Sequence, residues 1–254
     1  MLSITNRHQS ILDKLQEKGY VNVLDLCKTL DVSAVTVRKD LKLLEEKGLL
    51  FRSHGGASLH NPYINEKPVN EKEYIRSEEK MRIGKAASQL ILPDDTFIIA
   101  SGTTVLALAR QIRPVGQLTA ITASLNVALE LNRHPEIEVL QLGGALRKSS
   151  FSVAGSFSEL MLENFSCSKL FLGIDGIDLE FGLSTTNISE AQLNQKMISA
   201  AQKTIVLADS SKFGKRGFGK ICNLDELDQI ITDKEAPAHY VKALEEKGIE
   251  VTIV

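Results

Sequence analysis

Three short segments rich in glycine and small polar residues each follow a predicted strand in the C-terminal part of the chain. They are Ser101-Gly102-Thr103-Thr104, Ser124-Leu125-Asn126 and Gly143-Gly144. The first two segments each open a predicted helix, where backbone N–H groups favour an anion and hydroxyl groups add hydrogen-bond donors. Each segment alone is typical of turn and N-cap chemistry. Because ligands bind at the carboxyl ends of strands in open α/β sheets, the three segments together predict a phosphate site.

Carboxylates and one lysine lie near the ends of later strands. Asp175 and Asp178 end one predicted strand, Glu190 opens a helix, and Lys212 follows another strand. Taken singly, they are typical of turn formers, a helix-dipole partner and a surface cation. At one sheet edge, the carboxylates suit sugar hydroxyl groups and Lys212 suits a phosphate. The sequence contains neither Gly-x-x-x-x-Gly-Lys-Ser/Thr nor Gly-x-Gly-x-x-Gly, which argues against an ATP or dinucleotide site.

A second set of polar residues lies on a predicted helix near the N-terminus. Ser33 is a good N-cap for a helix over residues 34–47. The other face of this helix must point away from its apolar residues, and it carries Thr36, Arg38 and Lys39. Ser33 and Thr36 can reach phosphates or bases, and the planar fork of Arg38 suits guanine or phosphate. The apolar residues are Val37, Leu41 and Leu44.

A predicted hairpin follows this helix and would form a wing. It carries Arg52 and the glycine turn His54-Gly55-Gly56, where the backbone can approach DNA closely. Arg7 and His8, at the start of the first predicted helix, could add phosphate contacts. Asp40 is expected to be a structural partner instead of a DNA contact. The alternative interpretation of these residues is an ordinary solvated face on a small helical domain.

Two domains of different kinds must position these residues. Residues 1–59 contain three short predicted helices and a hairpin, which predict a winged helix-turn-helix whose third helix enters a DNA major groove. Residues 60–80 contain two prolines and few large apolar residues, so they predict a linker. Residues 81–254 alternate apolar strands with helical patterns, which predicts an α/β domain with a parallel sheet.

The expected elements of the larger domain can be given by range. The strands are expected at residues 97–100, 118–122, 137–142, 169–174, 204–208, 229–232 and 250–254. The helices are expected near residues 78–91, 104–112, 125–133, 157–164, 188–202 and 238–247. Several strands are continuous apolar runs, as expected where both faces of a sheet are covered.

The composition is globular, and the charge is unevenly distributed. The 254 residues include 30 Lys and Arg against 32 Asp and Glu, a net charge of −2, and 43% are hydrophobic. Residues 1–60 contain nine basic and seven acidic residues, so the acidic excess lies in the remainder. The near-neutral total therefore does not exclude DNA binding.

Some classes of protein are not expected from this sequence. No apolar run reaches the roughly 18 residues of a membrane span, and no signal peptide is recognised, so the expected location is the cytoplasm. The three cysteines, Cys27, Cys167 and Cys222, fit neither a disulfide framework nor a paired metal motif. No cofactor, metal or membrane partner is predicted.

The N-terminal motifs closely resemble those of DeoR-family transcriptional regulators. The resemblance rests on Arg7-His8-Gln9, on Val32-Ser33-Ala34-Val35-Thr36-Val37-Arg38-Lys39-Asp40-Leu41 and on Gly48-Leu49-Leu50-Phe51-Arg52-Ser53-His54-Gly55-Gly56-Ala57. One departure is Lys39, where the family often has a second Arg; the charge is kept, but the bidentate fork is lost.

The C-terminal motifs are similar to the effector domain of the same family, which in turn resembles ribose-5-phosphate isomerase. The resemblance implies a homo-oligomeric repressor of sugar-metabolism genes, a dimer or a tetramer, whose binding to operator DNA responds to a phosphorylated sugar. The effector residues that it implies are Ser101, Gly102, Thr103, Thr104, Ser124, Asn126, Gly143, Gly144, Asp175, Glu190 and Lys212.

The alternative is an isomerase-like enzyme fused to a DNA-binding domain. Isomerisation of a sugar phosphate needs a carboxylate base and a cation that stabilises the enediolate oxygen. Residues 179–187, where the isomerases have a lysine loop, contain no cation, and Gly173-Ile174-Asp175-Gly176 replaces a Gly-Ala-Asp-Glu motif. Catalysis is therefore not expected. A pure scaffold is the third class, and it would not need a polar sheet edge suited to phosphate.

Overall fold

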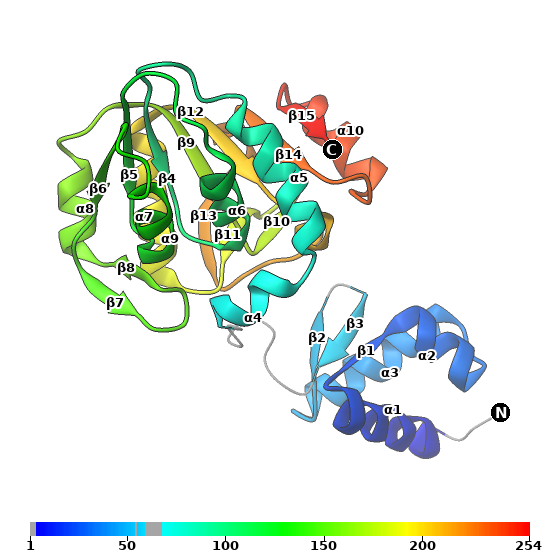
Figure 1. Cartoon of the computed structure of the whole chain (residues 1–254). Helices are drawn as coiled ribbons and strands as arrows, with labels where there is room; N and C mark the ends of the chain where they lie inside the picture. The colour runs from blue at the N-terminus through cyan, green and yellow to red at the C-terminus, as the bar shows by residue number, and fades with distance from the viewer. Residues whose placement is uncertain (1–3, 54, 59–67) are drawn as a thin grey trace. The chain divides into compact units, whose positions relative to one another are not determined.

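The computed structural model describes residues 4–53, 55–58 and 68–254. The chain divides into two compact units, residues 1–65 and 66–254, and each is described here by itself (Figure 1). His54, which is predicted to contact DNA, residue 59 and residues 60–67 of the predicted linker lie outside the described residues.

The N-terminal unit is a three-helix domain with a small sheet. Its elements are α1 (Ile4–Lys18), β1 (Tyr20–Asn22), α2 (Val23–Leu30), α3 (Ala34–Glu46), β2 (Phe51–Ser53) and β3 (Gly56–Ser58). The strands form an antiparallel sheet in the order β1-β3-β2, so the extended segment before α2 joins the predicted hairpin. The side chains of Asn22 and Ser33 cap the N-termini of α2 and α3. Asp31, in the left-handed region at the end of α2, and the Ser33 cap form the tight turn between these two helices.

The core of this unit is built from the apolar stripes of its helices. Ile11 and Leu15 of α1, Leu26 of α2 and the α3 residues Val37 and Leu41 are fully or almost fully buried in one cluster. Because the apolar side of α3 is turned into this core, its other side is left at the surface. The predicted winged helix-turn-helix fold is confirmed.

The second unit is built on a seven-stranded parallel sheet. Its strands are β4 (Thr96–Ile99), β5 (Leu118–Thr122), β6 (Ile137–Gln141), β9 (Cys167–Gly173), β12 (Ala201–Leu207), β14 (Gln229–Thr232) and β15 (Glu250–Ile253), in the order β15-β14-β12-β9-β4-β5-β6. Every neighbouring pair in this sheet is parallel. The order reverses direction about the neighbouring strands β4 and β9, and such a reversal is where ligands bind in open α/β sheets.

Helices cover both faces of this sheet. They are α5 (Ser77–Ser88), α6 (Thr103–Gln111), α7 (Leu125–Leu131), α8 (Ser156–Leu162), α9 (Ile188–Ser199) and α10 (Ala238–Glu245). Helices α5, α6 and α7 share one buried cluster with the sheet, and α8, α9 and α10 share the other. Along β9, Phe171 belongs to the first cluster, whereas Leu170 and Leu172 belong to the second. This burial on both faces explains the continuous apolar runs in the sequence.

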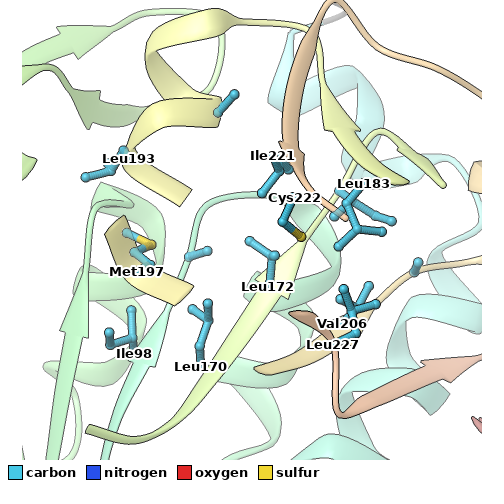
Figure 2. Close-up of a cluster of buried hydrophobic side chains, with 14 of the residues drawn as sticks. Ile98, Leu170, Leu172, Leu183, Leu193, Met197, Val206, Ile221, Cys222 and Leu227 are labelled. Atoms are coloured by element: carbon cyan, nitrogen blue, oxygen red, sulfur yellow. The ribbon is translucent and has the colours of Figure 1, made fainter. Parts of the chain in front are cut away.

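Short strands extend the fold beyond the main sheet. They are the hairpin β7 (Ala145–Arg147) and β8 (Ser152–Ala154), and an antiparallel sheet of β10 (Gly176–Asp178), β11 (Gly182–Thr185) and β13 (Gly219–Cys222). Figure 2 shows Leu183, Ile221 and Cys222 of this small sheet in the same buried cluster as Leu172 and Val206 of the main sheet. The small sheet therefore packs on the face of the main sheet that α9 covers. Its strands β10 and β11 follow β9 along the chain, so they place this segment beside the carboxyl edge of the main sheet.

The segment predicted as the end of the linker is helical. Residues Val69–Tyr74 form helix α4, and α5 begins at Ser77 (Figure 1). Val69 and Lys80 are buried, although Lys80 carries a charge. The sequence does not predict helix α4 because the segment has no apolar periodicity. Its position depends on contacts with other parts of the second unit.

None of the described helices is long and apolar enough to cross a membrane.

Candidate functional site

One pocket at the carboxyl edge of the parallel sheet gathers most of the predicted effector residues. Seven of the eleven line it, and its free volume of about 50 Å³ has room for a few water molecules. The predicted residues in the lining are Ser101, Gly102, Thr103, Thr104, Asp175, Glu190 and Lys212. The other lining residues are Val69, Lys72, Ser149, Ser150, Gly173, Ile174 and Thr185.

Glu190 connects two walls of this pocket. It lies in the first turn of α9, where its backbone N–H donates to Asn187 Oδ1 at 3.1 Å. Its carboxylate accepts a hydrogen bond from Ser101 Oγ at 2.5 Å and another from Arg147 Nη1 at 2.6 Å. Both carboxylate oxygens are therefore engaged, one by the strand end after β4 and one by the β7–β8 hairpin.

Asp175 lies between two ammonium groups. Lys72 Nζ is 2.9 Å and Lys212 Nζ is 3.7 Å from Asp175 Oδ1, and Thr185 Oγ1 donates to Oδ2 at 3.1 Å. Burial alone would raise the pKa of Asp175, but the two lysines and the Thr185 hydrogen bond hold it far below the ordinary aspartate value. The pocket therefore holds an ionised carboxylate and two cations at neutral pH.

The N-terminus of α6 opens into the same pocket. Its N-cap is Gly102, with φ +127°, and no described side chain accepts a capping hydrogen bond there. The next residues, Thr103 and Thr104, both line the pocket. Backbone N–H groups at such an end suit an anion, and Lys72 and Lys212 add positive charge nearby.

Four predicted effector residues do not line this pocket. Ser124 is buried and caps α7 by accepting from the N–H of Val127 at 3.4 Å, and Asn126 is the second residue of that helix. Gly143 accepts from Ser158 Oγ, and a Cβ at Gly144 would lie 2.7 Å from the same hydroxyl. Gly144, with φ +147°, allows the chain after β6 to pack against α8, which is a structural reason for its residue type.

The side chain of Asp178 stabilises a turn and does not line the pocket. It accepts from the backbone N–H groups of Glu180 and Phe181 at 2.9 and 2.8 Å and from Arg216 Nη2 at 2.8 Å. These bonds hold the β10–β11 hairpin.

The N-terminal unit presents a second polar surface on α3. Ser33 Oγ accepts from the backbone N–H of Thr36 at 3.2 Å and lies 3.0 Å from Thr36 Oγ1. Arg38 and Lys39 are exposed, and so is Val35 in the first turn. The exposed face of this helix therefore combines two cations, two hydroxyls and one methyl-bearing side chain.

Arg7 and His8 differ from the prediction that they contact phosphates. Arg7 is buried and donates to both oxygens of Asp40, at 2.8 and 3.0 Å, and His8 Nε2 lies 3.2 Å from Asp40 Oδ1. Burial would raise the pKa of Asp40, but the hydrogen bonds from Arg7 and His8 lower it below the ordinary value. The cluster ties α1 to α3, because the carboxylate needs partners inside the domain.

The wing residues have different local roles. Arg52 is exposed, and its Nε donates to Glu45 Oε2 at 2.7 Å. Gly55 is exposed with φ +80°, which favours glycine. Gly56 is buried, and a Cβ there would overlap the carbonyl oxygen of Val21 and the ring of Tyr20. The glycine at position 56 is thus required by the close approach of β1 and β3.

Comparison with known proteins identifies both units. Residues 7–62 match the DeoR-like helix-turn-helix domain, and residues 75–234 match the DeoR C-terminal sensor domain. The chain belongs to the DeoR family. In this chain the DNA-binding domain comes first and the sensor domain follows.

Named relatives span nearly the whole chain. The "Putative aga operon transcriptional repressor" of Escherichia coli O157:H7 is 39% identical over 253 residues, which cover 98% of this chain and 94% of that protein. The transcriptional regulator GlpR of Haloferax volcanii is 33% identical over 96% of both chains. Among solved structures, ribose 5-phosphate isomerase A from Methanocaldococcus jannaschii matches with 16% identity and a TM-score of 0.38, covering 57% of this chain and 55% of that one.

This DeoR-family protein is a DNA-binding transcriptional repressor and not an enzyme, as its relatives' names indicate. Among the described residues, no group of three or more His, Cys, Asp or Glu side chains is placed to hold a metal ion.

Several pocket residues are missing from the sequence prediction. Arg147 does not line the pocket but contacts its residue Glu190, and it ends the segment Gly143-Gly144-Ala145-Leu146-Arg147, whose glycines the sequence analysis does single out. Lys72 lies in the mixed-charge stretch Asn70-Glu71-Lys72-Glu73, where nothing distinguishes it from surface lysines. Ser149 and Ser150 reach the pocket only through the β7–β8 hairpin, which the sequence analysis does not predict.

Proposed function

We propose that this repressor controls genes of sugar metabolism and that a phosphorylated sugar, bound in the sheet-edge pocket, modulates its binding to operator DNA. The observation that carries the proposal is the pocket itself, which combines two ammonium groups, a helix N-terminus without a side-chain cap and two carboxylates. A relative's name supports the class of ligand: the glycerol-3-phosphate regulon repressor of Escherichia coli K12 is 28% identical over 98% of both chains.

Each group has a role in this proposal. The phosphate binds the N–H groups of Thr103 and Thr104 and the ammonium group of Lys212, because these are the anion donors of the pocket. Asp175 and Glu190 accept hydrogen bonds from sugar hydroxyl groups. Ser101 acts indirectly by orienting Glu190 through their 2.5 Å hydrogen bond.

The DNA contacts are proposed for α3 and the wing. Helix α3 lies in the major groove, its residues near the N-terminus contact bases, and the wing contacts phosphates. Two copies of the chain in a homo-oligomer, a dimer or a tetramer, bind two half-sites of the operator. The proposed DNA-contacting residues are Ser33, Thr36, Arg38, Lys39, Arg52, His54 and Gly55, whereas the buried Gly56 supports the wing from within.

A thermal-shift screen of the full-length protein tests the ligand class. The panel contains glycerol 3-phosphate, ribose 5-phosphate, glucose 6-phosphate and inorganic phosphate, with glycerol, ribose and glucose as controls without phosphate. A ligand that binds only the folded state raises Tm by mass action. We expect at least one sugar phosphate to raise Tm where its parent sugar does not, and a screen in which none does so contradicts the proposal.

Gel shifts then connect the ligand to the DNA. The operator is obtained by selecting duplexes from a random library with the wild-type protein. We expect the stabilising sugar phosphate to change operator affinity at least tenfold in the wild type. The variant Lys212→Ala is expected to keep its affinity for the operator and to lose this response. An unchanged response in that variant would exclude Lys212 from the site.

A further inference from the structure

Val35 lies on the surface of α3 that points away from the core of the DNA-binding unit. It is the second residue of the helix and is 74% exposed, whereas Val37, two residues later, is fully buried. Two residues span about 200° around an α-helix, so the side chain of Val35 is directed away from the buried stripe. Among the described residues of α3, it is the one large apolar side chain that is exposed. Packing in the core therefore does not explain why this residue is apolar.

The neighbours of Val35 on the helix surface are cations. Arg38 and Lys39 follow it by three and four residues, a spacing that places side chains next to each other on a helix, and both are exposed. The first turn of α3, which the structure describes in full, contains no acidic residue. Val35 is therefore an apolar position within a positively charged surface at the start of the helix.

The other end of α3 is acidic. Glu45 and Glu46 lie in its last turn, which contains no basic residue among those that the structure describes. Their carboxylates repel DNA phosphates, whereas the partial positive charge at a helix N-terminus attracts them. The charges on α3 thus favour the approach of its first half to DNA, and that half presents Val35 at its outermost position.

A valine side chain can recognise one feature of a base pair in the major groove. It has neither a hydrogen-bond donor nor an acceptor, so it cannot pair with the polar groups of base edges. Thymine presents a C5 methyl group there, which an apolar side chain can cover. The amino group of cytosine or the O6 atom of guanine against a valine loses water without gaining a hydrogen bond. The chemistry of Val35 therefore favours thymine and disfavours a G·C pair.

We propose that Val35 is a specificity-determining residue that reads the C5 methyl group of one thymine in each operator half-site, an inference that rests on the proposed function, in which α3 lies in the major groove. Arg38 and Lys39 attract the start of the helix to the DNA, and Val35 contacts the base edge beside them. The contact selects sequence without neutralising a phosphate. Its contribution to affinity is therefore nearly independent of salt.

The test removes methyl groups from the DNA and from the protein separately. Each thymine of the operator selected above is replaced by uracil, which lacks the C5 methyl group, at equivalent positions of both half-sites. The full-length variant Val35→Ala removes the two methyl groups of the side chain. The matched control is Val115→Ala, because Val115 is 63% exposed and lies in the sensor unit. Alanine has a higher helix propensity than valine, so Val35→Ala should have at least the wild-type Tm.

Gel shifts give the affinity of each protein for each duplex. At one thymine of the half-site, we expect uracil to lower the wild-type affinity about fourfold per half-site, or about 15-fold for two, which is the effect of one buried methyl group. The same uracil should change the affinity of Val35→Ala by at most about twofold, and this loss of additivity assigns the contact to Val35. Val35→Ala should keep the wild-type salt slope, and Val115→Ala should behave as the wild type.

Two results would overturn the inference and leave the proposed function in place. One is wild-type affinity for every uracil duplex, and the other is a uracil effect of the same size in Val35→Ala and the wild type. Arg38→Ala, measured on the same operator, tests the basis of the inference. If Arg38→Ala binds with wild-type affinity, α3 is not the helix in the major groove, and the proposed DNA contacts fail together with the inference.

Discussion

Arg147 donates a 2.6 Å hydrogen bond to Glu190, which joins strand β7 to the first turn of α9 across 43 residues of sequence. Ser101 holds the other oxygen of the same carboxylate. The Glu190 side chain therefore joins three segments that are far apart in the sequence: the segment after β4, strand β7 and the start of α9. The pair is nearly buried, with side-chain exposures of 15% for Arg147 and 12% for Glu190, so water competes little for it.

Replacing Glu190 should destabilise the sensor domain. Glu190→Gln leaves the Arg147 guanidinium facing an amide in a nearly buried site, which costs roughly 3 kcal/mol of the free energy of unfolding. Urea denaturation at pH 7, followed by circular dichroism, measures the loss. The control is Arg133→Ala, which breaks an exposed pair with Glu130 and should cost at most about 1 kcal/mol. Equal effects in the two variants would contradict this role of Glu190.

The Arg7–Asp40 pair should make the DNA-binding unit sensitive to acid. The pKa of Asp40 is lowered in the folded state, so the folded chain binds a proton less readily than the unfolded chain, where the pKa is about 3.9. The pair's stabilisation is therefore complete above about pH 5 and is lost as pH falls below 4 towards the lowered pKa. Asp40→Asn removes this contribution at every pH.

Hydrogen exchange of the α1 and α3 amides measures this effect in the full-length protein. Exchange should be faster in Asp40→Asn than in the wild type at pH 6, and the difference in opening free energy should shrink as pH falls from 5 to 3. A difference that stays constant over this range would show that Asp40 does not titrate with a lowered pKa.

Arg38 and Lys39 should affect DNA binding in different ways. If Arg38 reads a base, Arg38→Ala lowers operator affinity by about 1–3 kcal/mol, roughly five- to 150-fold, and relaxes the preference at one base pair. If Lys39 contacts a phosphate, Lys39→Ala weakens binding to all sequences alike and lowers the salt slope by about one. Gel shifts at several salt concentrations separate the two. Lys242→Ala, an exposed lysine of α10, is the control with the same loss of charge.

The main sheet could be predicted from the sequence, and the small strands could not. All seven predicted strands are present, because the inner strands are apolar runs buried on both faces, whereas the edge strands β6 and β15 are only partly buried. The strands β7, β8, β10, β11 and β13 contain three or four residues and have no comparable run. They depend on pairing and on packing, as Leu183 of β11 shows by its burial beside Leu172.

The pocket residues that follow the main strands could also be predicted from the sequence, and the others could not. Ser101 to Thr104, Asp175, Glu190 and Lys212 follow strands or open helices, so strand order alone brings them to one edge. Ser124 follows the same rule, yet its hydroxyl is used as the cap of α7. Lys72 could not be predicted, because α4 contains one buried apolar residue, Val69, and its place depends on contacts far along the chain.

Glu45 should weaken the binding of DNA through its contact with Arg52. It accepts from the Arg52 backbone N–H at 2.9 Å and from Nε at 2.7 Å, so the guanidinium of the wing is bound to a carboxylate of α3. A DNA phosphate must compete with that carboxylate for Arg52 and is also repelled by its charge. Glu45→Gln removes the charge while keeping an acceptor for the backbone N–H.

We therefore expect Glu45→Gln to bind the selected operator about three- to tenfold more tightly at low salt. The advantage should shrink at higher salt, because the added attraction is between exposed charges and is screened. Gel shifts at 50 and 200 mM salt measure both effects, and the double variant Glu45→Gln with Arg52→Ala shows whether Arg52 carries the gain. If the gain persists without Arg52, Glu45 acts by general repulsion of DNA and Arg52 is not the phosphate contact of the wing.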